Sequence, residues 1–369
     1  MRPCVPMCVS NCVANCVSIL LAVLLASPAR AAADARCRMR EEPLKLGDPR
    51  PSCSAGTRSR GTLLHGIRIP DTGCGYRRIF PHRAQAWGSD ELVHALLRVA
   101  RALDGEVFSH NLPGGVRPSL GVGNLGPPAG QEMQEDPYLG KRFSVSHGSG
   151  RAADLAFFII DRSGHSVTPN ETAVGYRMDG FNTSGWRRIY LRGHSEPRLP
   201  ERCRKGKTYD GITEWKCFEP AGAYRLDDER NWALARALLL DPEIGVIDPR
   251  TDRVRPRDRG IRRILVSNGI RERLLEEARR QGEPGRFVVL AEAVMTQPGN
   301  APPHDDHLHV DLNCTVGDIR GCGCLNAGIP PRPFEGEVLR IPRAPRGTAS
   351  DRSGQHARNL VRDRAGEQQ

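Results

Sequence analysis

The sequence lacks a hydrophobic run long enough to cross a membrane as a helix. No stretch of its 369 residues approaches the ~20 apolar residues that a spanning helix needs, and only 38% of the residues are hydrophobic. An internal repeat is also missing. The chain is rich instead in loop-forming residues, with 39 glycines and 29 prolines. These features are typical of a globular chain of one large domain or two ordinary ones, with many loops.

The chain carries an excess of positive charge that is not concentrated in one segment. It contains 54 lysines and arginines against 43 aspartates and glutamates, which gives a formal net charge of +11. Because the arginines are spread along the chain, we interpret them as a solvated basic surface and predict no specific nucleic-acid partner. The alternative is a protein that binds an anionic polymer through its arginines. Such binding should weaken with salt and survive chelation.

Residues 1–31 have the organisation of a secretory signal peptide. Arg2 supplies the positive start, Val17–Ala26 the apolar core and Ala29–Ala31 a cleavage site of small residues. A membrane anchor is the alternative, and it is disfavoured because the apolar stretch is too short. We therefore expect cleavage near Ala32, no transmembrane anchor afterwards, and export to the periplasm or a similar compartment.

Four of the twelve cysteines lie in the predicted signal peptide, and eight remain in the mature chain. The eight are Cys37, Cys53, Cys74, Cys203, Cys217, Cys314, Cys322 and Cys324. An even number in an exported protein favours disulfides over thiol chemistry. Cys203 and Cys217 flank a 13-residue polar segment and are expected to close it. Cys314 is expected to pair with Cys322 or Cys324, and half of a zinc site at these three is the alternative.

Composition divides the mature chain into three parts. We predict a disulfide-stapled N-terminal arm at residues 32–75, a main domain at 76–330 and a mobile, Pro- and Arg-rich tail at 331–369. Residues from about 161–225 are polar and rich in glycine and arginine, and we interpret them as an insertion in the main domain. Residues 111–140 are rich in glycine and proline and are expected to form a long loop.

Hydrophobic periodicity and capping residues predict helices and strands along the main domain. The helices are expected at 89–103, 228–240 and 268–281, and the strands at 155–160, 264–267, 287–290 and 307–312. Strands and helices do not alternate regularly, so the fold class is α+β rather than a doubly wound sheet. We expect a small antiparallel sheet that carries the candidate metal ligands and is flanked by helices and long loops.

Two segments concentrate residues that bind metals. The first runs from His147 through a Gly-rich loop, which can fold tightly, to Asp154 at the start of an apolar strand. The second contains His304, His307 and His309, of which the last two point to one face of a strand because side chains alternate with period two. Either segment alone is more often an ordinary loop or a packed histidine pair. Together, in an exported chain, they predict a zinc site of imidazole and carboxylate groups.

These two segments resemble a known enzyme family. His147 and Asp154 at a spacing of seven, followed far downstream by His307-x-His309, form the pattern of the LAS metallopeptidases, which include D-Ala-D-Ala peptidases and lysostaphin-type enzymes. The spacing of His304, three positions before His307, is similar to that of the penicillin-insensitive murein endopeptidases of this family.

The resemblance covers about half of the mature chain. Val310 and Cys314 match the context of the triple histidine, and a weaker likeness runs through residues 53–104 and 227–275. It implies an exported enzyme that hydrolyses peptide cross-links of peptidoglycan, with D-alanyl–diaminopimelyl bonds as the expected substrate. The insertion at 161–225 departs from the pattern by its length and leaves the range of substrates open.

The resemblance also assigns roles to the site residues. It implies that His147, Asp154 and His309 bind one Zn²⁺. His307 would then lie beside the metal and polarise water or stabilise the tetrahedral intermediate. His304 falls where many relatives place a glutamate base, and a neutral histidine can accept a proton near pH 7.

Three alternatives stay open within this interpretation. Asp305 or Asp306 is the alternative base, or orients an imidazole. The function classes that compete with the murein endopeptidase are a catalytically altered peptidoglycan-binding protein and a LAS-type peptidase with another substrate. The resemblance further implies that whichever of Cys322 and Cys324 does not pair with Cys314 bonds to Cys53. Elimination then leaves Cys37 for Cys74.

Overall fold

The computed structural model describes residues 50–57, 61–106, 108, 118–128, 147–167, 171–172, 175–192, 202–209, 211–297, 299, 303–326 and 328–342. The chain divides into two units, Met1–Leu44 and Lys45–Gln369, and every described residue belongs to the second. The predicted signal peptide, Cys37 and most of the predicted loop at 111–140 lie outside the described residues. No helix within the described part of the chain combines the length and the apolar character that crossing a bilayer requires.

The helices of the described chain confirm the α+β class together with the sheets. They are α2 (Asp90–Gly105), α3 (Asp228–Leu239), α4 (Asn268–Arg280), α5 (Gly285–Val294) and α6 (Val316–Cys322). The first three match the predicted helices to within a few residues. The Ser89 side chain accepts a hydrogen bond from the amide of Leu92, so α2 begins with the expected N-cap.

Helix α5 corrects one prediction. Residues 287–290 were expected to form a strand, but they lie inside α5. The buried residues of α5 recur at helical spacing, and they are Phe287, Val288, Leu290, Ala291 and Val294. A short apolar run fits a buried strand and a buried helix equally well, and only the residues around it distinguish the two.

A seven-stranded sheet forms the centre of the described chain. Its order is β17 (Met295–Thr296), β16 (Ile261–Leu265), β18 (His307–Leu312), β8 (Ala152–Ala156), β7 (Leu120–Val122), β5 (Tyr76–Arg78) and β4 (Thr72–Gly73). The pairs β16–β17 and β5–β7 are parallel and the others antiparallel. The sheet is therefore larger than predicted and mixed rather than purely antiparallel.

The predicted strand 155–160 is divided between two sheets. Its first half ends β8, and its second half forms β9 (Ile159–Asp161) of a three-stranded sheet with β10 (Ser166–Val167) and β15 (Tyr224–Leu226). At the break, the Asn231 side chain of α3 bonds both backbone groups of Phe158, at 2.9 Å to the amide and 2.8 Å to the carbonyl. The amide of Asn231 thus replaces the strand pairing that a continuous β8–β9 would have made.

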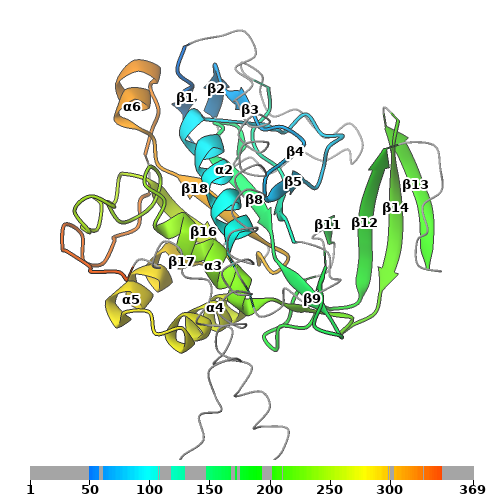
Figure 1. Ribbon diagram of the computed structural model, residues 1–369. Helices are drawn as coiled ribbons and strands as arrows, with labels where there is room; N and C mark the ends of the chain where they lie inside the picture. The colour runs from blue at the N-terminus through cyan, green and yellow to red at the C-terminus, as the bar shows by residue number, and fades with distance from the viewer. Residues whose placement is uncertain are drawn as a thin grey trace, which may run out of the picture. The chain divides into compact units, whose positions relative to one another are not determined.

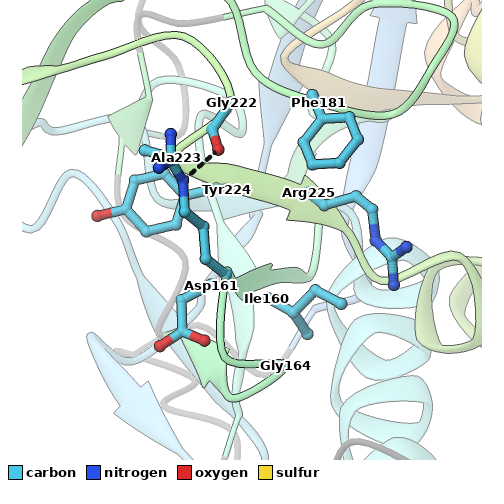
Figure 2. Close-up of a pocket in the computed structure, with 9 residues that line it drawn as sticks. Ile160, Asp161, Gly164, Phe181, Gly222, Ala223, Tyr224 and Arg225 are labelled. Atoms are coloured by element: carbon cyan, nitrogen blue, oxygen red, sulfur yellow. Dashed lines mark hydrogen bonds between the residues drawn. The ribbon is translucent and has the colours of Figure 1, made fainter.

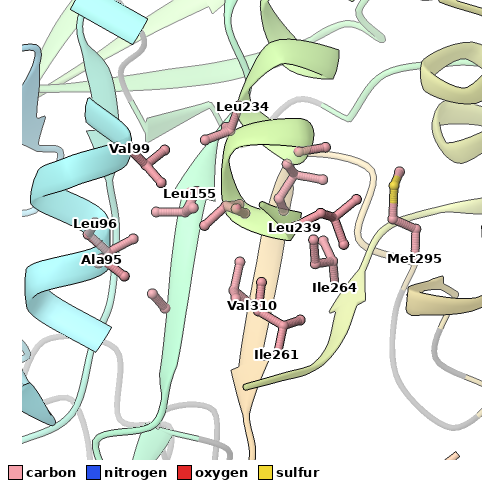
Figure 3. Close-up of a cluster of buried hydrophobic side chains, with 14 of the residues drawn as sticks. Ala95, Leu96, Val99, Leu155, Leu234, Leu239, Ile261, Ile264, Met295 and Val310 are labelled. Carbon is pink, nitrogen blue, oxygen red and sulfur yellow. The ribbon is translucent and has the colours of Figure 1, made fainter. Parts of the chain in front are cut away.

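The hydrophobic core lies between the central sheet and helices α2 and α3. Figure 3 shows Val99 of α2 and Leu234 of α3 beside Leu155 of β8, with Val310 of β18 and Ile264 of β16 nearby. In β18 the apolar residues alternate with histidine and aspartate. One face of this strand therefore enters the core, and the other is left for polar side chains.

The predicted insertion contains a second large sheet. Its order is β11 (Glu171–Thr172), β12 (Gly185–Arg192), β14 (Ile212–Glu219) and β13 (Cys203–Tyr209), all antiparallel (Figure 1). We call it the inserted sheet. Cys203 and Cys217 face each other across β13 and β14 and form the predicted disulfide.

Two further disulfides hold the chain beyond β18. Cys314 bonds Cys324 and Cys53 bonds Cys322, which resolves the alternatives that the sequence left open. Cys53 begins the hairpin of β1 (Cys53–Gly56) and β2 (Gly61–Leu64). A separate two-stranded sheet follows, in which β3 (Ile67–Arg68) pairs with β6 (Trp87–Gly88). Cys74 is also disulfide-bonded. Its predicted partner lies outside the described residues.

The predicted C-terminal tail is described only as far as residue 342, and this part packs against the domain. Leu339 and Ile341 are buried. The Arg332 guanidinium donates to four backbone carbonyls, including that of Ile261 at 2.6 Å. Residues 331–342 of the predicted tail thus contact the domain through a few apolar side chains and one buried arginine, although the segment has no apolar periodicity.

Candidate metal centre

The polar face of β18 carries the downstream histidines. His307, His309 and Asp311 alternate with the buried Leu308 and Val310, as a strand of period two requires. The antiparallel register of β18 and β8 sets His309 directly opposite Asp154. The register therefore brings the two predicted motifs together, which no spacing within either motif could show.

His147 enters the centre from the tight turn that precedes β8. Gly150 closes this turn with a φ of +68°, a region that favours glycine, and its amide donates to the carbonyl of His147 at 3.0 Å. Nδ1 of the buried His147 ring lies 3.2 Å from the carbonyl of Ala152. Because a carbonyl only accepts, Nδ1 carries the proton and Nε2 keeps its lone pair. Nε2 lacks a hydrogen-bond partner among the described residues and lies 3.3 Å from Asp154 Oδ1.

His309 is oriented by a carboxylate that the sequence analysis missed. Its Nε2 lies 3.0 Å from Asp311 Oδ1, and its Nδ1 lies 2.8 Å from Asp154 Oδ1. Asp311 is fully buried and also accepts a hydrogen bond from Nε of Arg263 at 2.8 Å. Asp311 can therefore hold the proton of Nε2, which leaves Nδ1 as the atom that faces the centre. The signal in the sequence was its position two residues after His309, on the same strand face.

Asp154 is the point on which the histidines converge. Nitrogen atoms of His147, His307 and His309 lie 3.3, 3.3 and 2.8 Å from its Oδ1. Its other oxygen accepts a hydrogen bond from the Asn124 side chain at 3.3 Å. Ligand atoms of His147, Asp154 and His309 all lie within 4.8 Å of one another, so these residues can hold a metal ion. The three predicted ligands are thus brought together in one cluster.

The remaining histidines border this cluster. Atoms of His304, His307 and His309 also lie within 4.8 Å of one another, so the two possible metal groups share His309. Nδ1 of His304 is buried without a hydrogen-bond partner among the described residues. Nδ1 of His307 lies 2.6 Å from Asp306 Oδ1. A carboxylate therefore orients the His307 ring, whereas no described residue forms a hydrogen bond with Nδ1 of His304.

The pKa values of the cluster show a field that favours positive charge at its centre. Burial is the largest influence on His307 and lowers its pKa, but Asp154 and Asp306 outweigh it and raise the pKa to about 10. His309 follows the same pattern, and its pKa is raised to about 9. The imidazoles in turn hold the pKa of Asp154 well below its usual range in spite of burial. Burial and the neighbouring imidazoles lower the pKa of His304 to about 4.

The insertion contacts the segment that carries His304. The amide of Tyr176 donates to the carbonyl of Asp305 at 2.8 Å, and a Cβ on Gly175 would lie 2.2 Å from Asp305 Oδ2. Only glycine leaves room for this carboxylate, whose pKa burial raises. Asp305 is therefore turned toward the insertion, while Asp306 is turned toward His307.

A separate cavity is lined by residues of β9, β15 and the turns beside these paired strands. It has a volume of about 190 Å³, and its lining includes Asp161, Arg162 and Arg225 (Figure 2). Arg162 donates to the carbonyl of Gly222 at 2.9 Å. None of the predicted site residues lines this cavity.

Comparison with known proteins adds no assignment to this centre. No known protein family has a sequence profile that matches the chain, and no curated protein matches it significantly.

Proposed function

We propose that this chain is an exported zinc-dependent endopeptidase that hydrolyses peptide cross-links of peptidoglycan, with D-alanyl–diaminopimelyl bonds as its substrate. The convergence of His147, Asp154 and His309 is the observation that carries the proposal. Two imidazoles and one carboxylate form a ligand set of the kind that catalytic zinc sites use, with one position open for water or substrate.

The donor atoms fit a zinc ion. The unpartnered, buried Nε2 of His147 has the lone pair that a metal ligand needs. The low pKa of Asp154 keeps its carboxylate charged. Asp311 accepts a hydrogen bond from Nε2 of His309, so Nδ1 of that ring is left to bind the metal. A zinc ion bound by these atoms supplies polarisation of the scissile carbonyl and activation of water.

His304 is the group that we assign as general base. Its pKa of about 4 keeps the imidazole neutral at pH 7, where it can accept a proton from water. Asp306 is engaged with His307 and Asp305 lies against Gly175, so neither carboxylate competes well for this role. His307 lies beside the three ligands with its ring anchored by Asp306, a position that suits stabilisation of the negative oxygen that develops on the attacked carbonyl.

Export and the peptidoglycan substrate have different support. Three disulfides among described cysteines are typical of a protein that folds in an oxidising compartment. The substrate is supported by the resemblance of the two histidine segments to the LAS metallopeptidases.

Digestion of purified sacculi tests the proposal. The mature chain should release cross-linked peptides cut at D-alanyl–diaminopimelyl bonds, identified by mass, and a chelator should abolish the release. The matched control is His165→Ala, which removes a half-exposed histidine outside the centre and should leave activity unchanged. Binding to sacculi with no cleavage under any metal would favour the altered peptidoglycan-binding protein instead.

A further inference from the structure

The inserted sheet carries a row of positive charges that the proposed peptidase chemistry does not use. Arg188 of β12 pairs in register with Lys216 of β14, and Lys216 pairs with Arg204 of β13. Like charges directly opposite each other destabilise a sheet. The four strands of the inserted sheet together hold seven lysines and arginines and three glutamates, of which Glu171 of β11 is in register with Arg188. A row of this kind is therefore expected to have a compensating anion.

Part of that compensation comes from a glutamate of β14. Oε1 of the buried Glu214 lies 3.5 Å from Nε of Arg188 and 3.7 Å from Nζ of Lys216. Both distances exceed a hydrogen bond, and Oε1 has no hydrogen-bond partner among the described residues. Arg188 is also in register with Glu171 of β11. The three cations of the row therefore outnumber the two glutamates beside them, and the row keeps an excess of positive charge.

An aromatic side chain lies beside the row. Trp186 is 38% exposed, and the Arg204 guanidinium lies 4.3 Å from its ring centroid. Trp186 also packs edge-on against Phe218, with 5.6 Å between ring centroids. A guanidinium that stacks on an aromatic ring can still donate hydrogen bonds from the N–H groups at its edge.

The charged row and the tryptophan line one cavity of about 310 Å³. Its lining residues are Gly185, Trp186, Arg188, Arg204 and Lys216. Guanidinium and ammonium groups bind carboxylates by charge-assisted hydrogen bonds, and a tryptophan offers an apolar surface to the adjacent part of a ligand. Gly185 contributes backbone but no side chain to the lining.

We propose that this cavity binds the free carboxylates of peptidoglycan stem peptides and thereby holds the sacculus beside the enzyme. The identity of the polymer rests on the proposed function. A nucleic acid is disfavoured because the Cys203–Cys217 disulfide lies within the same sheet, which places the cavity in an oxidising compartment. The cavity is made from the insertion alone and contains none of the metal-centre residues.

Co-sedimentation of the full mature chain with purified sacculi tests this site. The unaltered chain should bind sacculi on ice equally well with and without a chelator. This binding should weaken as the salt concentration rises. R204E and W186A should each raise the dissociation constant at least tenfold. The matched control is K205E, which makes the same charge change at the next residue of β13, on the opposite face of the strand and exposed. K205E should change the constant less than twofold.

Two further arms make the outcome decisive. Sacculi whose carboxylates have been converted to neutral amides should bind the unaltered chain at least tenfold more weakly. Near-UV circular dichroism of the sheet tryptophans checks that R204E folds. If R204E does not fold, R204Q takes its place. Equal losses in R204E and K205E, normal binding to amidated sacculi, or DNA binding of equal strength and equal sensitivity to R204E would each overturn the site.

The failure of this inference can be told apart from failure of the proposed function. Carboxylate-dependent binding without zinc-dependent cleavage would leave the cavity assigned and refute the peptidase. Zinc-dependent cleavage of soluble cross-linked peptides, together with binding to sacculi that W186A does not weaken, would support the peptidase and refute the cavity assignment.

Discussion

The central sheet and the inserted sheet both align charged side chains across neighbouring strands, but with different partners. On β18 and β8, His309 faces Asp154 in register, and His309 is buried together with His147 and Asp311. On the inserted sheet, Arg188, Lys216 and Arg204 face one another at the surface. The first arrangement pairs opposite charges, and the second brings like charges together.

Burial explains this difference. A charge removed from water needs a partner close by, so the buried centre has a chain of them, from Arg263 through Asp311 to His309 and Asp154. Partly exposed cations keep part of their water and can outnumber the carboxylates near them, such as Glu214. The comparison indicates that the buried cluster is arranged for a cation and the open row for an anion.

The largest expected effect tests whether the buried histidine cluster binds a cation. His147→Ala or His309→Ala removes a buried ligand nitrogen and should abolish both zinc binding and cleavage. Metal analysis of the purified chain should give one zinc per unaltered chain and none per variant, while His165→Ala retains it. A full equivalent of zinc bound with unchanged affinity in His309→Ala would refute the ligand assignment.

The next effect separates chemistry from metal binding within the centre. His304→Ala should keep the zinc and lower the turnover by about 10²- to 10⁴-fold, the usual contribution of a general acid–base group. Turnover and metal content are measured on the same preparation. Near-normal turnover would move the role to Asp305, Asp306 or His307, and loss of the metal would make His304 a ligand.

Removal of one disulfide from each region compares how much each bridge contributes to the free energy of unfolding. The Cys53–Cys322 bridge spans a sequence separation of 269 residues, and the Cys203–Cys217 bridge spans 14. The chain-entropy model gives about 5 kcal/mol or more for the long loop and about 3 kcal/mol for the short one. Paired Cys→Ser variants, unfolded in denaturant, should therefore lose more stability without the long bridge. An equal or larger loss without the short bridge would contradict this order.

Asp311 tests whether the buried charges act as a connected chain. Asp311→Asn should weaken zinc binding by about 10- to 100-fold, as loss of an orienting partner of a metal-binding histidine does. Competition with a chromogenic chelator measures the affinity. Arg263→Gln, one step further from the metal, should have a smaller effect in the same direction. An unchanged affinity in Asp311→Asn would show that His309 needs no orienting carboxylate.

The smallest effect concerns His82, a residue that the inserted sheet influences. Burial is the main cause of its pKa of about 4, and Arg83, Arg78 and Arg188 lower the pKa further. The unfolded chain, with a histidine pKa of about 6.5, binds more protons between pH 4 and 6.5, so the free energy of unfolding should rise with pH across this window and level off above it.

His82→Gln should flatten this pH dependence. Because His82 is partly exposed, we expect a change of about 1 kcal/mol once solvent screening is allowed for. Denaturant unfolding at pH 4.5 and 7 measures it, with His165→Gln as the exposed control. An undiminished slope in His82→Gln would assign the acid sensitivity to other groups.

Several elements were predictable because local signals agree there. The helix Asp90–Gly105 is long and amphipathic, and its N-cap serine forms the expected bond. Elsewhere the local signal was ambiguous. Residues 287–290 form a helix and residues 155–160 are split between two sheets, because a short apolar run does not reveal which neighbours will cover it. The pairing of Cys314 with Cys324 rather than Cys322 was likewise a matter of geometry.

The sequence by itself determined which residue types are available and which side chains share a strand face, because a strand alternates with period two. His307, His309 and Asp311 belong to one face for that reason alone. Only the tertiary structure decided that His309 meets Asp154, 155 residues earlier, and that Arg188, Lys216 and Arg204 form one row. Register between strands depends on how the whole core packs, and a shift of one residue would turn each of these side chains to the other face.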